Sequence, residues 1–257
     1  MGVARPTALC ILAVVALTGC GAATAGKAPP EPGVAKAHAA EKTCRAREYR
    51  RLRNRTTAYA AVVHRTAVAY RRPGSARVAR FGPKNANGAA TVFGVLGAVV
   101  TRKCAPTWYR VQLPMRPNGI VGYVRARDVA LLRVRTRIEV DISRRRVTLF
   151  RRGKPVLSAT AAVGSSATPT PTGEYYVNQR LIPTDTSGPF GPGAIGVSAF
   201  SNVLTGWTQG GPIAIHGTNQ PWSIGQPVSN GCIRLPNKVL RRMFAASLAG
   251  TPVVIHE

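Results

Sequence analysis

The sequence has few acidic residues, no cysteines at metal-binding spacing and no evident internal repeat. Its 257 residues include 9 Asp and Glu against 36 Lys and Arg, which gives a formal net charge of +27. Neither C-x₂-C nor H-x₃-H spacing occurs among the 5 cysteines and 4 histidines, although structural zinc sites are typically built on such spacing. We therefore expect no metal site and no bound cofactor.

Only the N-terminus has an apolar run typical of a targeting segment. Residues 1–20 contain a positive charge at Arg5, an apolar stretch from Thr7 to Leu17 and small residues before Cys20. The stretch is too short for a permanent membrane-spanning helix and is typical of a signal peptide. No later stretch is long and apolar enough to cross a membrane, so we expect everything after residue 20 to be exported.

The last residues of this segment, Leu17-Thr18-Gly19-Cys20, resemble the bacterial lipobox. The resemblance implies a lipoprotein, with Cys20 as the lipidated first residue of the mature chain. Such a protein would lie on the outer face of the cell membrane, facing the cell wall, because buried lipid chains supply membrane affinity. The alternative is an ordinary signal peptide in which the cysteine occurs by chance.

Export gives each cysteine a different expected fate. Cys10 is removed with the signal peptide, and Cys20 would carry lipid. Cys44 and Cys104 are the candidates for a disulfide outside the cell, although the sequence alone leaves the pairing open. Cys232 is then left unpaired, so it either has a chemical use or is buried and inert.

The excess of basic residues allows two interpretations. A strongly basic chain can bind nucleic acid, but here the arginines are scattered and lie in no nucleic-acid-binding motif. For an exported chain we favour the alternative, which is attraction to anionic wall polymers and to lipid head groups. We expect no specific nucleic-acid partner, and nothing in the sequence indicates more than a monomer.

Residues 21–58 are expected to form a tether or linker, followed by a small β-domain over 59–134. Residues 21–40 are small and contain proline, so they cannot pack a core. Short β-prone runs separated by turn signals then favour a small barrel. The runs are Ala61–Tyr70, Arg77–Phe81, Thr91–Val100, Trp108–Leu113 and Gly119–Val124.

The end of this region resembles a bacterial SH3-type domain. The resemblance rests on Trp108-Tyr109-Arg110-Val111 followed by Gly122-Tyr123-Val124. It implies an SH3-like barrel, either as a wall-binding or spacing module or in a purely structural role.

Residues 136–257 are expected to form a second, mainly β domain. Alternating residues in Arg137–Ile142 and Arg145–Phe150 predict a hairpin turned at Ser143-Arg144. A last strand is predicted over Pro252–His256. One helix is predicted over Asn237–Leu248, with Leu240, Met243, Phe244 and Leu248 on one stripe.

Two segments of the second domain indicate nucleophilic chemistry. The apolar strand Ile213–Ile215 leads directly into His216, and Cys232 follows Gly231 in a turn before the helix. A neighbouring imidazole can lower the pKa of a thiol and accept its proton. A tight turn at Gly231 would let backbone N–H groups face a developing oxyanion. The hypothesis is acyl transfer through a thioester, with no acidic residue close to the motif.

His216-Gly217-Thr218, together with Ser229-x-Gly231-Cys232-Ile233-Arg234, resembles the active-site signature of the L,D-transpeptidase (YkuD-like) catalytic domains. The resemblance covers roughly residues 136–256 and implies a β-sandwich with one main helix. One position departs from the pattern, because Asn230 stands where the family often has His. We take the catalytic His to be the upstream one, His216.

The resemblance implies that Cys232 attacks the carbonyl after the third residue of a peptidoglycan tetrapeptide stem and releases D-alanine. An amine on a neighbouring stem then resolves the thioester and forms a 3→3 cross-link. His216 would act as base and then as acid, oriented by the carbonyl of Gly217 instead of a carboxylate.

Four further residues are candidates for substrate binding, each with a structural alternative. Arg234 could meet a substrate carboxylate or brace the loop, and Ser229 could hold substrate or shape the turn. Thr218 and Asn230, which lie within the two segments of the signature, are the other two candidates. Alternative functions are an L,D-carboxypeptidase, a protein-to-wall linking enzyme or a non-catalytic wall-binding lipoprotein.

Overall fold

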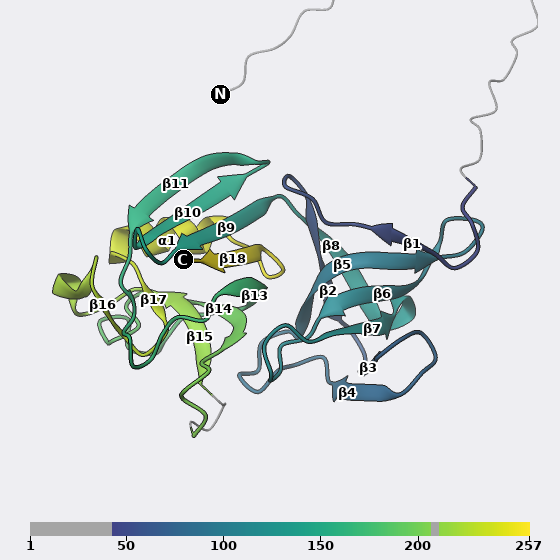
Figure 1. The fold of residues 1–257 in the computed structure, drawn as a ribbon, viewed down its shortest axis with the longest axis horizontal. Coiled ribbons are helices and arrows are strands. Elements are labelled where there is room, and N and C mark those ends of the chain that lie inside the picture. The colour runs from purple at the N-terminus through teal and green to yellow at the C-terminus, as the bar shows by residue number, and fades with distance from the viewer. Residues whose placement is uncertain (1–42, 207–210) are drawn as a thin grey trace, which may run out of the picture. The chain divides into compact units, whose positions relative to one another are not determined.

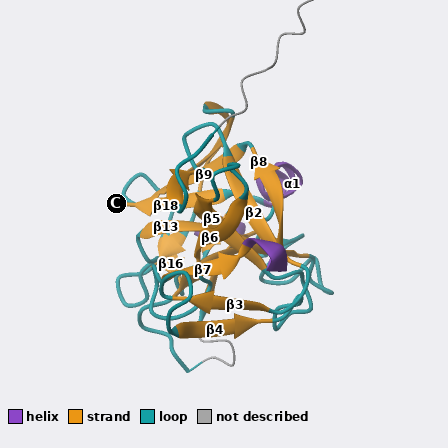
Figure 2. Cartoon of the chain, turned by 90° about the vertical axis from the view of Figure 1, so that its right-hand side faces the viewer, coloured by secondary structure: helices purple, strands orange, loops and turns teal. Residues whose placement is uncertain are grey.

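A computed structural model describes residues 43–206 and 211–257, which form a mainly β structure (Figures 1 and 2). The expected signal peptide, the proposed lipidation site Cys20 and residues 21–42 of the expected tether lie outside the described residues. Residues Lys42–Glu257 form one compact unit. No helix within the described part of the chain is both long and apolar enough to cross a membrane.

The N-terminal sheet contains eight strands in the order β4-β3-β7-β6-β5-β2-β8, and β1 pairs with β5. All of its pairings are antiparallel. Its core includes Phe93, Val95, Val111 and Val124, all essentially inaccessible to solvent. Its elements are β1 (Glu48–Arg51), β2 (Ala58–Val63), β3 (Ala67–Tyr70), β4 (Arg77–Phe81), β5 (Val92–Val100), β6 (Pro106–Gln112), β7 (Val121–Arg125), the 3₁₀ turn η1 (Ala126–Asp128) and β8 (Val129–Val134).

Two sequence-based expectations for this region need correction. The tether predicted over 21–58 extends too far, because β1 lies inside that range and pairs along its whole length with β5. The single run predicted over Ala61–Tyr70 is divided between β2 and β3. These strands pair with different partners, β2 with β5 and β8, β3 with β4 and β7, so the chain must turn between them.

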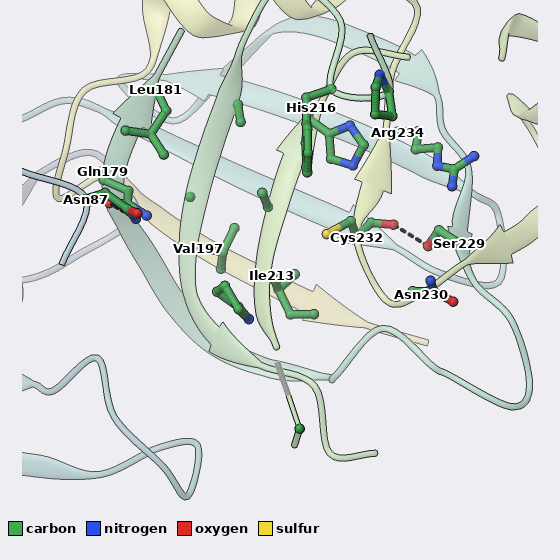
Figure 3. Close-up of a pocket in the computed structure, with 17 residues that line it drawn as sticks. Asn87, Gln179, Leu181, Val197, Ile213, His216, Ser229, Asn230, Cys232 and Arg234 are labelled. Carbon is green, nitrogen blue, oxygen red and sulfur yellow. Dashed lines mark hydrogen bonds between the residues drawn. The ribbon is translucent and has the colours of Figure 1, made fainter. Parts of the chain in front are cut away.

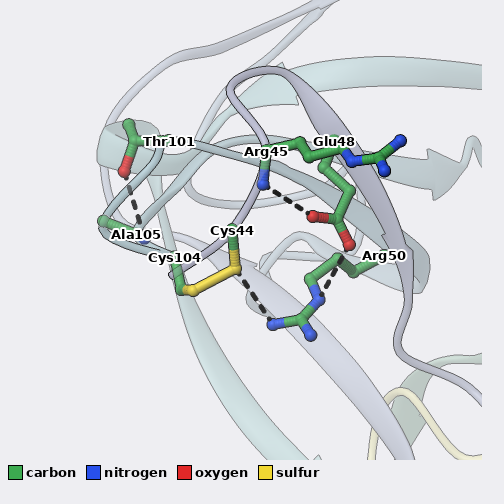
Figure 4. The surroundings of a disulfide bond; sticks show 7 residues. All are labelled: Cys44, Arg45, Glu48, Arg50, Thr101, Cys104 and Ala105. Carbon is green, nitrogen blue, oxygen red and sulfur yellow. Dashed lines mark hydrogen bonds and ion pairs between the residues drawn. A yellow bond between two sulfur atoms is a disulfide. The ribbon is translucent and has the colours of Figure 1, made fainter. Parts of the chain in front are cut away.

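A disulfide joins Cys44 to Cys104, the pair expected from the sequence (Figure 4). It fastens the segment before β1 to the turn between β5 and β6. Glu48 supports the same segment by accepting a hydrogen bond from the backbone N–H of Arg45 at 3.0 Å and by pairing with Arg50 at 3.4 Å. The start of the compact unit is thus linked covalently to the turn that follows β5.

The C-terminal sheet has the strand order β11-β10-β9-β18-β13-β14-β15-β17, and β12 pairs separately with β16. Within the eight-stranded sheet, β18 runs parallel to β9 and β15 runs parallel to β17. Its elements are β9 (Thr136–Asp141), β10 (Arg146–Arg151), β11 (Lys154–Thr160), β12 (Val163–Gly164), β13 (Gly173–Leu181), β14 (Ala194–Phe200), β15 (Pro212–His216), the 3₁₀ turn η2 (Pro221–Ser223), β16 (Pro227–Ser229), β17 (Ile233–Arg234), α1 (Asn237–Ala246) and β18 (Pro252–His256).

Helix α1 packs its apolar stripe against this sheet. Leu240 and Met243 are fully buried in the core with Ile138 and Ile195. Each such burial stabilises the fold by about 1.5–3 kcal/mol. The helix ends two residues earlier than predicted, because Ser247 is extended at φ −93° and ψ 121°. Leu248 therefore leaves the stripe and is 51% exposed.

Hydrogen bonds join the two sheets within the compact unit. The buried hydroxyl of Tyr176 on β13 donates to the backbone oxygen of Val92 at 3.0 Å. Glu174, also on β13, accepts from Arg53 at 2.6 Å, and its backbone oxygen accepts from Gln112 at 2.7 Å. Strand β13 supplies these three contacts, and Asn118 adds hydrogen bonds to the backbone of Phe200 at the end of β14.

Candidate active site

A cavity of about 710 Å³ opens on the C-terminal sheet and contains the residues singled out from the sequence (Figure 3). Cys232, His216, Ser229, Asn230 and Arg234 all line it. The remaining lining residues are Asn87, Gln179, Leu181, Pro189, Phe190, Ala194, Gly196, Val197, Gly206, Pro212, Ile213 and Ala214.

The register of two parallel strands places the thiol and the imidazole on one face of the sheet. His216 on β15 pairs with Arg234 on β17, and Ile215 pairs with Ile233. Side chains alternate between the faces of a strand, so Cys232, two residues before Arg234, points to the same side as His216. Ile215 and Ile233 fill the opposite face and are fully buried in the core.

His216 is held in one tautomer by its own neighbour. Its Nδ1 lies 2.6 Å from the backbone oxygen of Gly217, the contact that the family resemblance implied. Because a carbonyl oxygen only accepts hydrogen bonds, Nδ1 carries the proton and Nε2 has the free lone pair. The ring of Phe190 packs against the imidazole with centroids 4.9 Å apart.

The imidazole is neutral at physiological pH. His216 is only 5% exposed. Burial lowers its pKa to about 4, the hydrogen bond to Gly217 acts against this, and the positive charge of Arg234 adds to it. Neutral Nε2 can therefore accept a proton from a neighbouring group.

Cys232 is the free cysteine of the described residues and is partly buried. Burial raises the pKa of its thiol, while the backbone of Ala214 and the charge of Arg234 act in the opposite direction. The expectation that His216 lowers the pKa of this thiol is therefore not met, since the loss of hydration outweighs the effects of the Ala214 backbone and the Arg234 charge. The structure records no hydrogen bond between these two described side chains, and both are neutral at rest.

The turn before the thiol is shaped by Ser229 and Gly231. The Ser229 hydroxyl donates to the backbone oxygen of Cys232 at 2.5 Å and accepts from the N–H of Gly231 at 3.2 Å. Gly231 has φ +103°, a conformation that a residue with a Cβ rarely adopts. The hydroxyl proton of Ser229 and the amide of Gly231 are thus engaged within the turn, and a direct role of either in catalysis or binding stays a prediction.

The loop after His216 is fastened to the start of α1 by Asn237, which the sequence reasoning missed. Its Oδ1 accepts from the backbone N–H of Thr218 at 2.8 Å. A Cβ added to Gly217 would lie 2.3 Å from the same oxygen, so only glycine fits there. Thr218 is buried, its hydroxyl accepts from the N–H of Gln220, and it does not line the cavity. An asparagine at the first turn of a helix was the available signal.

Arg234 provides positive charge beside Cys232 and His216. Its Nη1 donates to Oε1 of Gln220 at 2.8 Å, and the side chain still lines the cavity. Its charge favours the thiolate of Cys232 and disfavours the imidazolium of His216. The bracing contact with Gln220 is present, and a substrate contact stays a prediction.

Asn230, expected to bind substrate, is exposed and lines the cavity. A substrate contact of this residue stays a prediction. Within 43–206 and 211–257, no group of three or more His, Cys, Asp or Glu side chains is arranged to hold a metal ion. Asn87, from the N-terminal sheet, also lines the cavity and carried no recognisable signal in the sequence.

Residues 135–255 match the family model of the L,D-transpeptidase catalytic domain, YkuD. YkuD of Bacillus subtilis (strain 168), which is named for L,D-transpeptidase activity, is 37% identical over 119 residues, or 46% of this chain and 65% of that protein. Its namesake in Bacillus licheniformis is 36% identical and is covered over 64% of its length. The chain thus spans just under two thirds of these relatives.

Among solved structures, the catalytic domain of the Enterococcus faecium L,D-transpeptidase is 25% identical, with 47% of this chain and 96% of that chain covered and a TM-score of 0.35. L,D-transpeptidase 3 of Mycobacterium tuberculosis is 17% identical over 66% and 92% of the two chains, with a TM-score of 0.40. These scores add nothing to the sequence match. The match supports a YkuD-like L,D-transpeptidase catalytic domain over the second sheet and α1.

Proposed function

We propose that this protein is a peptidoglycan L,D-transpeptidase that forms 3→3 cross-links through a thioester on Cys232. The observation on which the proposal rests is the placement of Cys232 and His216 on one face of β15 and β17, in one cavity, within the family-matched segment. The donor is a tetrapeptide stem, and the acceptor is an amine on a neighbouring stem.

In the first step, Sγ of Cys232 bonds to the carbonyl carbon of the third stem residue. His216 Nε2 takes the thiol proton as this bond forms. The C–N bond to D-alanine then breaks, and the departing amine receives the proton from the imidazolium. The Gly217 carbonyl holds the ring in the required tautomer throughout.

In the second step, the acceptor amine attacks the thioester carbonyl and gives its proton to the neutral His216. The new C–N bond forms, the C–S bond breaks, and the imidazolium returns the proton to the sulfur. Both steps begin and end with a neutral thiol and a neutral imidazole. No carboxylate partner is required, because a backbone oxygen orients the imidazole.

Burial makes the proton transfer part of the attack instead of a preceding equilibrium. The pKa of His216 is about 4 and that of Cys232 is raised, so a thiolate–imidazolium pair is scarcely populated at rest. As the sulfur bonds to carbon it becomes more acidic, and the neutral base can then remove its proton. Arg234 lowers the cost of negative charge on the sulfur during this step.

The proposed setting is the outer face of the cell membrane. The lipobox-like sequence ending at Cys20 supports export and lipid anchoring, and the residues before the first strand supply a tether. The formal charge of +27 favours contact with anionic wall polymers and lipid head groups. The region from residue 59 to 134 is proposed to be an SH3-like module.

The experiment combines labelling with product analysis. A carbapenem should add its mass to the wild-type protein at Cys232 and not to Cys232→Ala. Incubation with disaccharide-tetrapeptide should release D-alanine and give cross-linked dimers. Tripeptide monomers without dimers would instead show an L,D-carboxypeptidase. A folded, reduced sample that is neither labelled nor active would refute the enzyme assignment and favour a wall-binding protein.

A further inference from the structure

The loop between β4 and β5, residues 82–91, is held together by internal hydrogen bonds. Asn85 organises it: its side-chain oxygen accepts from the backbone N–H groups of Asn87 and Ala89 at 3.0 and 3.1 Å. The backbone of Asn85 also exchanges hydrogen bonds with Ala89 and Gly88, and Thr91 donates to Pro83. A loop with this many internal hydrogen bonds presents its side chains in fixed positions.

This loop is fastened to the C-terminal sheet beside the catalytic cavity. The amide nitrogens of Asn85 and Asn87 both donate to Oε1 of Gln179 on β13, at 2.8 and 3.0 Å. Figure 3 shows Asn87 and Gln179 together at the side of the cavity away from Asn230. The buried hydrogen bond from Tyr176 to Val92 holds the end of the same loop against the same strand.

A second hollow of about 420 Å³ adjoins the catalytic cavity where the loop contacts Gln179. The two share Asn87, Gln179 and Pro212 as lining residues. The second hollow is otherwise lined by Arg80, Phe81, Gly82, Lys84, Asn85, Ala86, Thr91, Val92, Pro114, Asn178 and Phe200. The surface around the thiol thus continues from the C-terminal sheet onto the N-terminal sheet.

The lining of the second hollow is chemically one-sided. Arg80 and Lys84 supply two positive charges, and four amide side chains also line the hollow, three of which bond to one another. No carboxylate is among the described lining residues. Guanidinium and ammonium groups favour carboxylates, and amides suit a peptide backbone. The ligand class that fits is a peptide with a free carboxylate, which every linear stem peptide has at its C-terminus.

We infer that the second hollow is the binding site for the acceptor stem, so that the N-terminal sheet selects the amine that resolves the thioester. This rests on the proposed function. The donor stem is held covalently once Cys232 is acylated. The acceptor stem must compete with water and therefore depends on a site that raises its effective concentration. The transfer itself is the second step above: the C–N bond forms, the C–S bond breaks, and the amine proton reaches sulfur through His216.

The test removes the two cations from the hollow without touching the catalytic groups. R80Q/K84Q replaces exposed side chains, and R71Q/R72Q removes the same number of charges from an exposed turn of the same sheet outside both hollows. The probe is a disaccharide-tripeptide, which lacks the fourth residue and cannot acylate the enzyme. Its Kd, measured by calorimetry, should rise about fivefold to tenfold in R80Q/K84Q and stay unchanged in the control.

Product analysis provides the second measurement. With disaccharide-tetrapeptide, R80Q/K84Q should release D-alanine in a single turnover at the wild-type rate but yield fewer dimers and more tripeptide monomers. Equal tripeptide affinity in both double variants would overturn the inference, and so would slowed D-alanine release, which would assign the hollow to the donor. If a carbapenem does not label the wild type, the proposed function is refuted instead. The tripeptide Kd would still decide whether the hollow binds the peptide.

Discussion

Replacing His216 by glutamine should remove an acid-sensitive part of the folding stability. The imidazole has a pKa of about 4 in the folded protein against 6.5 for an unperturbed histidine, chiefly because of its burial. Between these values the unfolded chain binds a proton that the folded chain does not, so stability rises with pH across this window. The gap of about 2.5 pH units, at about 1.4 kcal/mol each, corresponds to about 3 kcal/mol.

The assay is urea denaturation of the wild type and His216→Gln at pH 7.5, 6, 5 and 4. The wild-type stability relative to the variant should be greatest above pH 6.5 and should fall by about 3 kcal/mol towards pH 4. Other histidines and all carboxylates are common to both proteins and cancel in the difference. A difference that stays constant from pH 7.5 to pH 4 would refute the burial of a neutral imidazole.

Three further changes test the frame around the site. C44A/C104A should lower the free energy of unfolding by about 4 kcal/mol, since the disulfide closes a loop with a sequence separation of 60. Equal urea midpoints for the oxidised wild type and the variant would contradict this. Asn237→Ala should slow carbapenem acylation several-fold and lower the free energy of unfolding by about 1–2 kcal/mol, because the backbone N–H of Thr218 loses its side-chain acceptor. Unchanged acylation would show that this anchor does not position the imidazole. Tyr176→Phe should lower the free energy of unfolding by about 1–2 kcal/mol, because the backbone oxygen at the start of β5 loses its donor. Thermal or urea unfolding measures this, and an unchanged stability would imply that another donor replaces the hydroxyl.

The parts of the fold that could be predicted are those with a strong local pattern. The strand over Arg77–Phe81 and the last strand over Pro252–His256 have the predicted bounds, and the hairpin of β9 and β10 lies where alternation placed it. Strand β14 was missed because nearly all of Ala194–Phe200 is buried, so its sequence does not alternate. The two-residue strand β17 is defined by its pairing with β15 and by a bridge to Ala162, and it has no pattern of its own.

The candidate site likewise contains residues that the sequence predicts and residues that it does not. Cys232 and His216 stood out because an unpaired thiol and a histidine at the end of an apolar strand both lie in the signature segments, and the parallel register of β15 and β17 brings them to one face. Asn87 could not be predicted, since it reaches the cavity from the other sheet, 92 residues before its partner Gln179. The neutral state of the pair also depends on burial, which a motif does not specify.

The neutral resting state would protect the Cys232 thiol in the setting proposed above. Oxidation and disulfide exchange require thiolate that is accessible to the reagent, whereas burial raises the pKa of Cys232, which lies at the wall of a cavity just before β17. The proposed export would place the protein in an oxidising setting, where a preformed thiolate would be lost to side reactions. A thiol that gives up its proton only while attacking a bound carbonyl avoids this loss, and the cost is a weaker base, since the same burial lowers the pKa of His216. Arg234 offsets part of that cost by favouring negative charge on the sulfur without itself accepting a proton.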